Sequence, residues 1–351
     1  MKFFKLDQFS GACILTVALA LLSVLAPCAF AQQNWTAKVG GQSKDMGDQA
    51  EAFLPNEFWI HAGDTITWTF ASGDTHTVTF LVVGQAFPTN FFAGCPGFSA
   101  SGAPFDGTAC VTSTPSVTGQ VFAVTFPTPG NFEIVCLVHP EMFGAVHVLP
   151  GSEILPHDQA FYDQRADDEL HALLDDQDPP TGKSHHSMAG VMSASVFPHS
   201  KGVIAGFGEI AATAGGQEAL SVVRFIDGTV QIHAGDTVEW SNLDPIIAHT
   251  ITFGTEPADL FDPSCGPSPS CVVSTDSDGA LHATITGPGQ NVHSGFILAA
   301  LEGYTGGPPV PQLPLFPPTR FRVTFIAPGT YNYKCSLHDN LGMVGKVIVQ
   351  P

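Results

Sequence analysis

Apolar and polar residues alternate with a period of two in short segments along most of the chain. The alternation is clear at residues 65–70 and at residues 230–232, and it is typical of β-strands with one buried face. Turn-forming pairs such as Pro129-Gly130 and Pro328-Gly329 separate such segments. With many short strands and no strong helix among them, the sequence predicts an all-β fold of two β-sandwiches.

A helical pattern occurs between the two predicted sandwiches, from about His157 to Asp176. Its apolar positions recur with helical spacing and fall on one face: Tyr162, Ala166, Leu170 and Leu173. The acidic side chains of the segment lie elsewhere on the predicted helix. We therefore expect an acidic linker over residues 151–186, with a helix that packs against one sandwich.

The two predicted sandwiches are copies of one unit. The segment 60–68 recurs at 232–240 with an offset of 172 residues, and His-Thr-Val-Thr-Phe at 76–80 recurs as His-Thr-Ile-Thr-Phe at 249–253 with an offset of 173. A third block, which ends in Cys136, recurs with an offset of 199 and ends in Cys335. The second copy therefore carries about 26 extra residues, which we place around residues 305–318. The predicted domains are residues 32–150 and residues 187–351.

The N-terminus has the pattern of a secretory signal peptide over residues 1–31. Two lysines precede an apolar run at residues 13–25, and Ala-Phe-Ala ends the segment at Ala31. We expect cleavage after Ala31 and a mature protein that is periplasmic or secreted. The apolar run is too short to span a bilayer, and no later run is longer, so no transmembrane segment is expected in the mature chain. Lipid anchoring at Cys28 is a minor alternative, because Pro27 before it is a poor fit.

Composition limits the possible partners. The chain has 32 Asp and Glu against 12 Lys and Arg, a formal net charge of −20. Binding to nucleic acid requires clustered lysine and arginine that displace counterions, so we expect no nucleic-acid partner. Hydrophobic residues make up 44% of the chain and charged residues 13%, which argues against a disordered acidic protein.

Six of the eight cysteines remain after the expected cleavage. In an oxidising compartment the simplest interpretation is three disulfides. Four of the cysteines form two close pairs in loop segments: Cys95 with Cys110, and Cys265 with Cys271. We expect each pair to form a local disulfide. The remaining two, Cys136 and Cys335, lie in different copies, so a bridge between them would have to cross domains.

These two cysteines instead begin the same motif. Each is followed at the third position by a histidine and shortly afterwards by a methionine, and each copy has a further histidine at the start of the repeated His-Thr-(Val/Ile)-Thr-Phe strand. One thiolate, two imidazoles and one thioether form the ligand set of a blue-copper electron-transfer site. The predicted ligands are His76, Cys136, His139 and Met142 in the first copy, and His249, Cys335, His338 and Met343 in the second.

These motifs make both copies resemble the cupredoxins, the plastocyanin and azurin family of small blue copper proteins. The second copy matches the plastocyanin spacing Cys-x2-His-x4-Met, and the first matches the shorter amicyanin spacing Cys-x2-His-x2-Met. The resemblance covers both sandwiches but not the signal peptide, the linker helix or the loop insertions. It implies Greek-key sandwiches with two type 1 copper ions, one per domain.

The sequences around the two predicted copper sites differ in two respects. The first copy has Ala-Ser-Gly-Asp at 71–74, where the second has the usual Asn242-Leu-Asp244 approach to its histidine. The loops that follow the two cysteines also differ in length. We therefore expect the two sites to differ in reduction potential.

The resemblance implies an electron carrier that acts between redox partner proteins, such as a cytochrome or an oxidoreductase. The acidic charge would steer a basic partner. In this family the histidine that follows the cysteine is the usual exit for the electron, which would be His139 and His338 here. The expected docking surface consists of apolar residues beside them: Pro140, Phe143, Leu341 and Gly342.

Two other functions compete with this interpretation. Two-domain multicopper oxidases and copper nitrite reductases are also tandem cupredoxins, but they bind further copper through His-x-His pairs and a histidine directly before the cysteine. This chain has no His-x-His pair, and Val135 and Lys334 precede its two cysteines, so we expect an electron carrier and not an enzyme. A copper-holding or delivery protein would have methionine- or histidine-rich tracts, which six methionines do not provide.

Four other histidines are expected to lie outside the copper sites. Two sit in the repeated Ala-Gly-Asp turns, and two sit next to Met188 in the linker region: His61, His233, His185 and His186.

Overall fold

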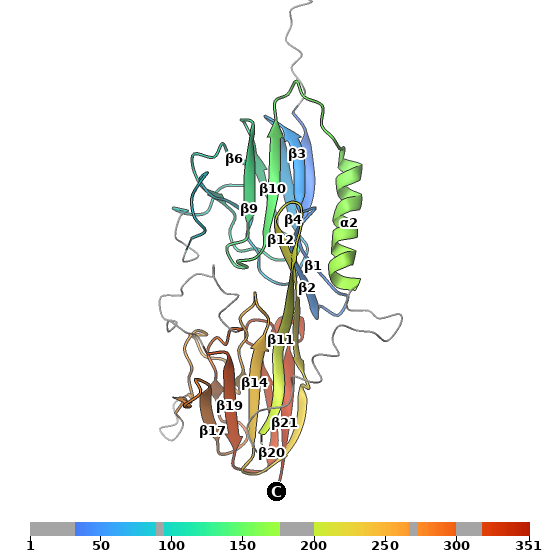
Figure 1. The fold of residues 1–351 in the computed structure, drawn as a ribbon. Coiled ribbons are helices and arrows are strands. Elements are labelled where there is room, and N and C mark those ends of the chain that lie inside the picture. Colours follow the sequence, from blue (N-terminus) through green and yellow to red (C-terminus); the bar gives the residue numbers. More distant parts are fainter. Residues whose placement is uncertain (1–31, 89–94, 176–199, 267–271, 300–317) are drawn as a thin grey trace, which may run out of the picture. The chain divides into compact units, whose positions relative to one another are not determined.

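The computed structural model describes residues 32–88, 95–175, 200–266, 272–299 and 318–351 (Figure 1). Residues Gln33–Pro351 belong to one compact unit. Among the described residues, no helix is long and apolar enough to cross a membrane. Several predictions lie outside this part of the chain: the signal peptide, nearly all of the insertion around residues 305–318, Cys271, and the pair His185 and His186.

The first domain is a sandwich of two layers. One layer has the strand order β2-β1-β4-β8-β6, and the other has the order β3-β10-β9-β5-β7. Large apolar side chains such as Trp68 and Phe80 fill the space between the layers, with ring centroids 5.8 Å apart. The strands are β1 (Asn34–Gln42), β2 (Asp48–Leu54), β3 (Glu57–His61), β4 (Thr65–Phe70), β5 (Thr79–Phe80), β6 (Ala103–Pro104), β7 (Val111–Thr112), β8 (Val121–Thr125), β9 (Gly130–Val135) and β10 (Phe143–Leu149).

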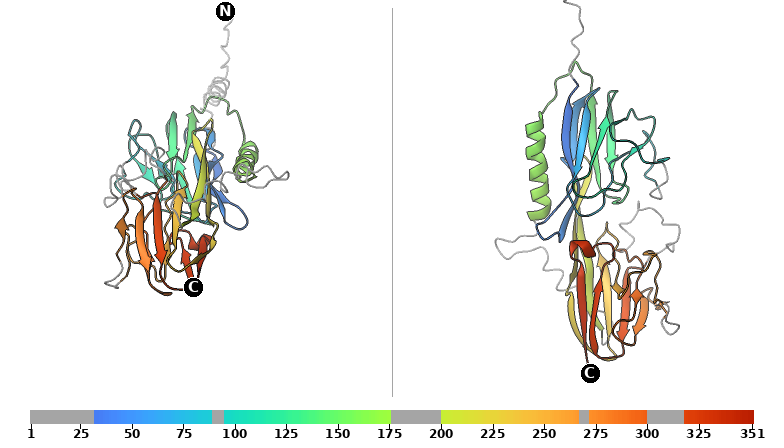
Figure 2. Two further views of the ribbon diagram at one scale, coloured as in Figure 1. Left: turned by 60° about the horizontal axis from the view of Figure 1, so that its bottom comes forward. Right: turned by 180° about the vertical axis from the view of Figure 1, so that it is seen from behind.

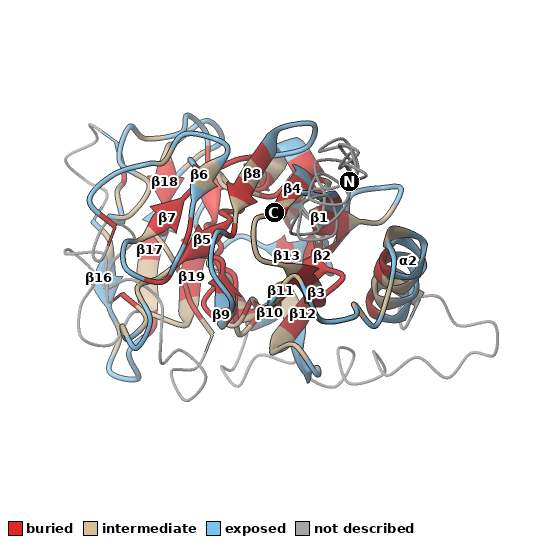
Figure 3. Cartoon of the chain, turned by 90° about the horizontal axis from the view of Figure 1, so that it is seen from above, coloured by how far each residue is buried: buried red, intermediate tan, exposed pale blue. Residues whose placement is uncertain are grey.

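The second domain repeats this plan. Its layers have the orders β12-β11-β14-β19-β17-β16 and β13-β21-β20-β15-β18. Trp240 and Phe253, the counterparts of Trp68 and Phe80, again meet in the core, 5.7 Å apart, and buried residues line the strands (Figure 3). The strands are β11 (Ser200–Ala212), β12 (Gln217–Ile226), β13 (Thr229–His233), β14 (Thr237–Leu243), β15 (Thr252–Phe253), β16 (Ser274–Thr275), β17 (Leu281–Ile285), β18 (Val292–His293), β19 (Arg320–Phe325), β20 (Gly329–Lys334) and β21 (Val344–Gln350). The all-β prediction with two sandwiches is confirmed.

Helix α2 (Gln159–Asp175) confirms the helix predicted from about His157 to Asp176. It lies along β1 and β2 of the first domain (Figure 2). Its predicted apolar face is the face that packs: Ala166 and Leu173 are buried against Ala50, Ala52 and Leu54 of β2. The hydroxyl of Tyr162 donates a hydrogen bond to the carbonyl of Trp59, at 3.1 Å, and so fixes the helix to β3.

A β-hairpin from each copy joins the two domains. Strands β2 and β12 pair antiparallel, with Gln49 opposite Ser221 and Ala50 opposite Leu220. Gln49 and Ser221 are separated by 172 residues, the offset of the repeat, so equivalent residues of the two copies face each other. The pairing therefore has the approximate two-fold symmetry of an isologous dimer interface. One continuous sheet runs from the first domain into the second.

The end of each hairpin also contacts the other domain. The carbonyl of Gly47 accepts a hydrogen bond from the amide of Val223 at 2.8 Å, and the carbonyl of Asp45 accepts one from Nη2 of Arg224 at 2.6 Å. In the other direction, β12 pairs with β10 at Phe143. The pattern of the sequence does not predict this joint, because a strand alternates in the same way whether its partner belongs to its own domain or to the next one.

Glu218 provides a test of the packing of β12. Its side chain is buried, and its Oε2 has no hydrogen-bond partner in the described part of the chain. Burial, together with the charge of Glu169, raises the pKa of Glu218 from 4.5 to about 7. A carboxyl group with a raised pKa favours folding when it is protonated, so this stability is present below pH 4.5 and is lost as the pH rises through about 7.

We expect Glu218→Gln to raise the free energy of unfolding at pH 8 by roughly 1–2 kcal/mol and to change it little at pH 4. Urea unfolding of the metal-free protein at the two pH values measures the difference. Glu209→Gln, at an exposed position on β11, is the control and should have a small effect at both. An equal gain at pH 4 and pH 8 would contradict the prediction.

Candidate metal centres

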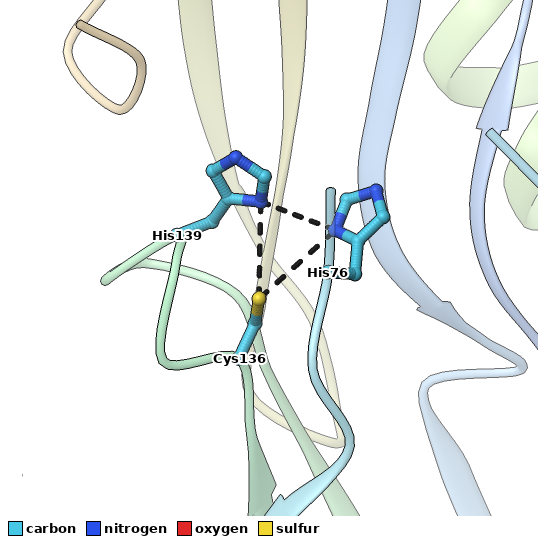
Figure 4. Close-up of side chains that lie close together, drawn as sticks. All are labelled: His76, Cys136 and His139. Atoms are coloured by element: carbon cyan, nitrogen blue, oxygen red, sulfur yellow. Dashed lines mark hydrogen bonds between the residues drawn. The ribbon is translucent and has the colours of Figure 1, made fainter. Parts of the chain in front are cut away.

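Three donor side chains meet at one end of the first domain. His76 precedes β5, and Cys136 and His139 lie in the loop between β9 and β10. The Nδ1 atoms of the two histidines are 3.1 Å apart, and they lie 4.0 and 3.8 Å from Sγ of Cys136 (Figure 4). Each side chain is exposed by 3% or less. These separations suit one ion bonded to all three, because metal–nitrogen and metal–sulfur bonds of about 2.0–2.3 Å place neighbouring ligand atoms about 3–4 Å apart.

The second domain has the same arrangement. Sγ of Cys335 lies 3.9 Å from Nδ1 of His249 and 3.4 Å from Nδ1 of His338. The two imidazole rings cross at 66°, compared with 67° in the first domain. All three side chains are again buried. A short 3-10 turn, η4 (Asp339–Leu341), follows His338 and occupies the longer loop of this copy.

The two predicted methionine ligands lie in the same loops and are completely buried. The amide of Cys136 donates a hydrogen bond to the carbonyl of Met142 at 3.1 Å, and the amide of Cys335 does the same to Met343 at 3.0 Å. Each loop thus closes on itself, and each methionine belongs to the core cluster that contains its cysteine.

The cysteines divide as expected between disulfides and free thiols. Cys95 and Cys110 form a disulfide, which confirms that pair. Cys265 is also disulfide-bonded, and its predicted partner Cys271 lies outside the described residues. Cys136 and Cys335 are free and buried, so both thiols are available to an ion.

Each free thiol is held in a polar environment that favours the thiolate. The amide of Thr77 donates to Sγ of Cys136 at 3.4 Å, and the amide of Thr250 donates to Sγ of Cys335 at 3.3 Å. Burial raises the pKa of Cys136, but hydrogen bonding with His139 and His76 and their positive charge outweigh it and lower the pKa well below its usual value. Against the same effect of burial, His338 lowers the pKa of Cys335. Thiolate is the form of cysteine that binds metal.

Two glycines allow the backbone to approach the first histidine of each site. Gly40 and Gly206 lie at β-bulges of β1 and β11 and have φ values of 66° and 83°. A Cβ at Gly40 would lie 2.6 Å from Nε2 of His76, and a Cβ at Gly206 would overlap the ring of His249. Neither glycine was predicted from the sequence, although each occupies a bulge in the corresponding strand of its copy.

The surroundings of the two sites differ, as the unequal approach segments indicate. In the first domain, Ser72 Oγ lies 2.7 Å from Nε2 of His76. In the second, Nε2 of His249 has no hydrogen-bond partner among the described residues, and Oδ2 of Asp244 is 3.9 Å away. The side chain of Asn242 instead donates to the carbonyl of Ile247 at 2.9 Å and fixes the segment that leads to His249.

A buried glutamate, Glu51, lies beside the first site and was not predicted. Its Oε2 is 3.2 Å from Nδ1 of His139 and 3.5 Å from Nε2 of His76, and neither carboxylate oxygen has a hydrogen-bond partner in the described ranges. Burial raises the pKa of Glu51, against the opposing charge of the two histidines. The repeat offset of 172 places Val223 at the equivalent position of the second copy. An acidic residue in one copy, aligned with a buried valine in the other, is the sequence signal that could have revealed Glu51.

The expected docking surface around the second histidines is mostly covered. The side chains of His139 and His338 are each 3% exposed. Of the four residues predicted beside them, Pro140 and Leu341 are buried, Phe143 is half-buried and Gly342 is exposed. The other domain covers this end of each sandwich; for example, Leu341 packs against Gly73. A single cupredoxin-like domain would expose this end, and the hairpin pairing between the two copies hides it.

The turn histidines lie away from both clusters, as predicted. Nε2 of His61 hydrogen-bonds with the carbonyl of Glu153 at 2.8 Å. His233 is largely exposed, and its Nδ1 is 4.0 Å from Asp236.

Comparison with known proteins finds a family match for the segment that contains Cys335, His338 and Met343. Residues 317–350 match the family described as copper binding proteins, plastocyanin/azurin family. Among solved structures, the chain is similar to a mutant of amicyanin in its reduced state, with 22% identity over 33% of this chain and 82% of amicyanin, and a TM-score of 0.22. It is also similar to the oxidised form of plastocyanin from Dryopteris crassirhizoma, with 16% identity over 42% of this chain and 98% of plastocyanin, and a TM-score of 0.21.

The close approach at Gly206 generates a testable prediction. We expect Gly206→Ala to lower the free energy of unfolding of the metal-free protein by roughly 2–5 kcal/mol, because left-handed strain adds to the overpacking of the histidine ring. It should also weaken metal binding by the second domain, because His249 has to move. Urea unfolding and metal titration measure the two effects.

The matched control is Gly235→Ala. Gly235 has a φ of 97°, but a Cβ at this position would have no heavy atom within 4 Å, so strain alone should lower stability by about 1–2 kcal/mol. Equal losses of stability in the two variants, with metal binding intact in both, would show that His249 does not need the glycine.

Proposed function

We propose that this chain, which belongs to the plastocyanin/azurin family of copper-binding proteins through its second domain, is an electron carrier with one type 1 copper ion in each domain. One observation carries the proposal. Each domain contains a free, buried cysteine thiol beside two histidine Nδ1 atoms, with sulfur–nitrogen distances of 3.4–4.0 Å. Soft sulfur and imidazole donors in this combination are those of a blue-copper site.

The protein supplies both the ligands and their rigidity. We propose that His76, Cys136, His139 and Met142 hold the first ion. His249, Cys335, His338 and Met343 would hold the second. Bound copper would accept and release one electron, because thiolate and thioether favour Cu(I) and imidazole also suits Cu(II). The backbone amides of Thr77 and Thr250 fix the two sulfur atoms, and such contacts orient ligands and tune the metal.

Burial of both sites also favours outer-sphere electron transfer. The six nitrogen and sulfur ligand side chains are exposed by 3% or less, so bulk water is excluded and the ligands cannot rearrange freely. We propose that the protein acts after secretion or in a periplasm, between redox partner proteins such as a cytochrome or an oxidoreductase. The net charge of −20 favours association with a basic partner at a rate that falls with salt.

An oxidase or nitrite reductase function is disfavoured by the sequence, which lacks the His-x-His pairs that such enzymes use for additional copper. We expect no sustained oxygen consumption when the copper-loaded protein is given a phenolic electron donor. Oxygen-electrode measurements test this, and continuous turnover would support the enzyme alternative over the carrier.

Copper content is the direct test of the proposal. We expect the mature protein to bind about two copper ions per chain and to show the intense blue absorption of thiolate-bound Cu(II). Cys136→Ser and Cys335→Ser should each remove one ion and part of the absorption, and the double variant should be colourless. Metal analysis and optical spectra of the same samples measure both quantities. A wild-type protein that stays colourless with cupric salt would refute the proposal.

The methionines are tested by substitution with leucine, which keeps the apolar volume and removes the sulfur. Removing a thioether ligand, which favours Cu(I), changes the relative stability of Cu(I) and Cu(II) at that site. Met142→Leu and Met343→Leu should therefore each change the reduction potential of one site by at least about 59 mV, which is a tenfold change in the equilibrium constant for one electron. Spectroelectrochemical titration measures the potentials. Each variant is the control for the other, and an unchanged potential would exclude that methionine as a ligand.

A further inference from the structure

We propose that Asp74 connects the two metal centres across the domain interface, so that the chain is an internal electron relay as well as a carrier. The inference rests on the proposed function, because it requires copper in both domains. Asp74 itself is not among the ligands that the motifs or the family resemblance predict.

The geometry brings the second histidine of each site to one carboxylate. Oδ2 of Asp74 lies 3.6 Å from Nε2 of His139, and Oδ1 of Asp74 lies 4.0 Å from Nε2 of His338. Each histidine directs its other ring nitrogen, Nδ1, toward the cysteine of its own site. The two imidazoles therefore extend from the two thiols toward the same acidic side chain.

This junction is closed to solvent. Asp74 is 7% exposed, and both histidines are 3% exposed. Oδ2 of Asp74 has no hydrogen-bond partner within the described ranges, and the nearest imidazole nitrogen to it is Nε2 of His139, at 3.6 Å. Burying a carboxylate oxygen without a hydrogen-bond partner is unfavourable, and the imidazole N–H groups of His139 and His338 are suitable partners.

The segment that carries Asp74 is fixed by hydrogen bonds within the first domain and packs against Leu341 of the second. The amide of Gly73 donates to Oε1 of Gln42 at 2.7 Å, and the amide of Thr75 donates to Oδ1 of Asp74 at 2.6 Å. A Cβ at Gly73 would lie 2.5 Å from the side chain of Leu341, so a larger residue here would displace Leu341 from its position against the first domain. The pairing of β2 with β12 maintains this contact.

Asp74, the carboxylate between the two sites, has no acidic counterpart in the second copy, although the interface is approximately symmetric. With the repeat offset of 173 residues, the position equivalent to Asp74 in the second copy is Ile247, a buried apolar residue. Glu51 and Asp74 are grouped with His139 closely enough to surround an ion, but His139 is already a ligand in the proposed first site. We therefore assign Asp74 a positioning role between two sites instead of a third metal site.

The relay step moves one electron and no atoms. With copper bound in both domains, one site would give up an electron and the other would accept it, without a proton transfer, and His139, Asp74 and His338 would provide the route between them. Electron tunnelling weakens steeply with the width of each non-bonded gap. The route through His139, Asp74 and His338 has two such gaps, of 3.6 and 4.0 Å, and the buried junction keeps water out of both.

The first experiment measures the geometry by magnetic coupling. In the full-length, fully oxidised two-copper protein, EPR spectroscopy should show dipolar coupling between the two Cu(II) ions. The Cys136→Ser protein, which retains one copper, should show none. Two blue copper ions without measurable coupling would overturn the inference and leave the proposed function intact, whereas a protein without blue copper would refute the proposed function itself.

The second experiment measures the rate of the internal step. After photoreduction by less than one electron per chain, the electron should redistribute between the two sites at a rate that does not depend on protein concentration. Asp74→Ala should slow this redistribution at least about tenfold, equivalent to about 1.4 kcal/mol in the barrier. Asp74→Asn, which keeps the bridging atoms, should stay within about threefold of the wild-type rate.

Asp45→Asn is the matched control. Asp45 also lies at the domain interface, where its carboxylate is 3.6 Å from Arg224 and 76% exposed, but it contacts neither metal centre. This variant should keep the wild-type rate. A concentration-dependent redistribution in the wild type, an unchanged rate in Asp74→Ala, or a third bound metal ion lost with Asp74 would each overturn the assigned role.

Discussion

The antiparallel pairing of β2 with β12 is the interaction on which the arrangement of both candidate metal centres depends. Backbone hydrogen bonds fix its register, with Gln49 opposite its own counterpart Ser221, and a slip by one residue would turn every side chain of the joint to the other face. Because the register is symmetric, it brings the same end of each sandwich to the interface. Those ends carry the loops with Cys136 and Cys335, so the joint determines that two buried sites face each other.

Duplication followed by divergence explains why two similar ligand sets have different surroundings. The first domain places polar groups around its histidines: Ser72, Glu51 and Asp74. The second uses Asn242 to fix its backbone and has Val223 and Ile247 at the positions of the two acids. Buried charges interact strongly because little water screens them, so these substitutions change the energy of an ion at one site more than at the other.

The same interface changes how a partner protein can reach the metal centres. The second histidines and the apolar residues beside them, such as Leu341, are covered by the other domain. A surface that serves docking in a one-domain carrier is here used to hold two domains together. In the proposed carrier, contacts with external partners would therefore involve other faces of the molecule, and the proposed connection through Asp74 would give both sites access to an electron that enters at either one.

The sequence by itself determined the local features of this protein. Period-two alternation predicted strands such as β4, helical spacing predicted α2, and the duplicated cysteine–histidine spacing selected the residues that the structure brings together. These features depend on neighbours within a few residues, or on a repeat that can be read directly. The tertiary structure alone decided the pairing of β2 with β12, the burial of His139 and His338, and the position of Asp74 between them. Backbone hydrogen bonding is the physical reason, because peptide groups pair in the same way within a domain and between domains, and side-chain patterns do not distinguish the two.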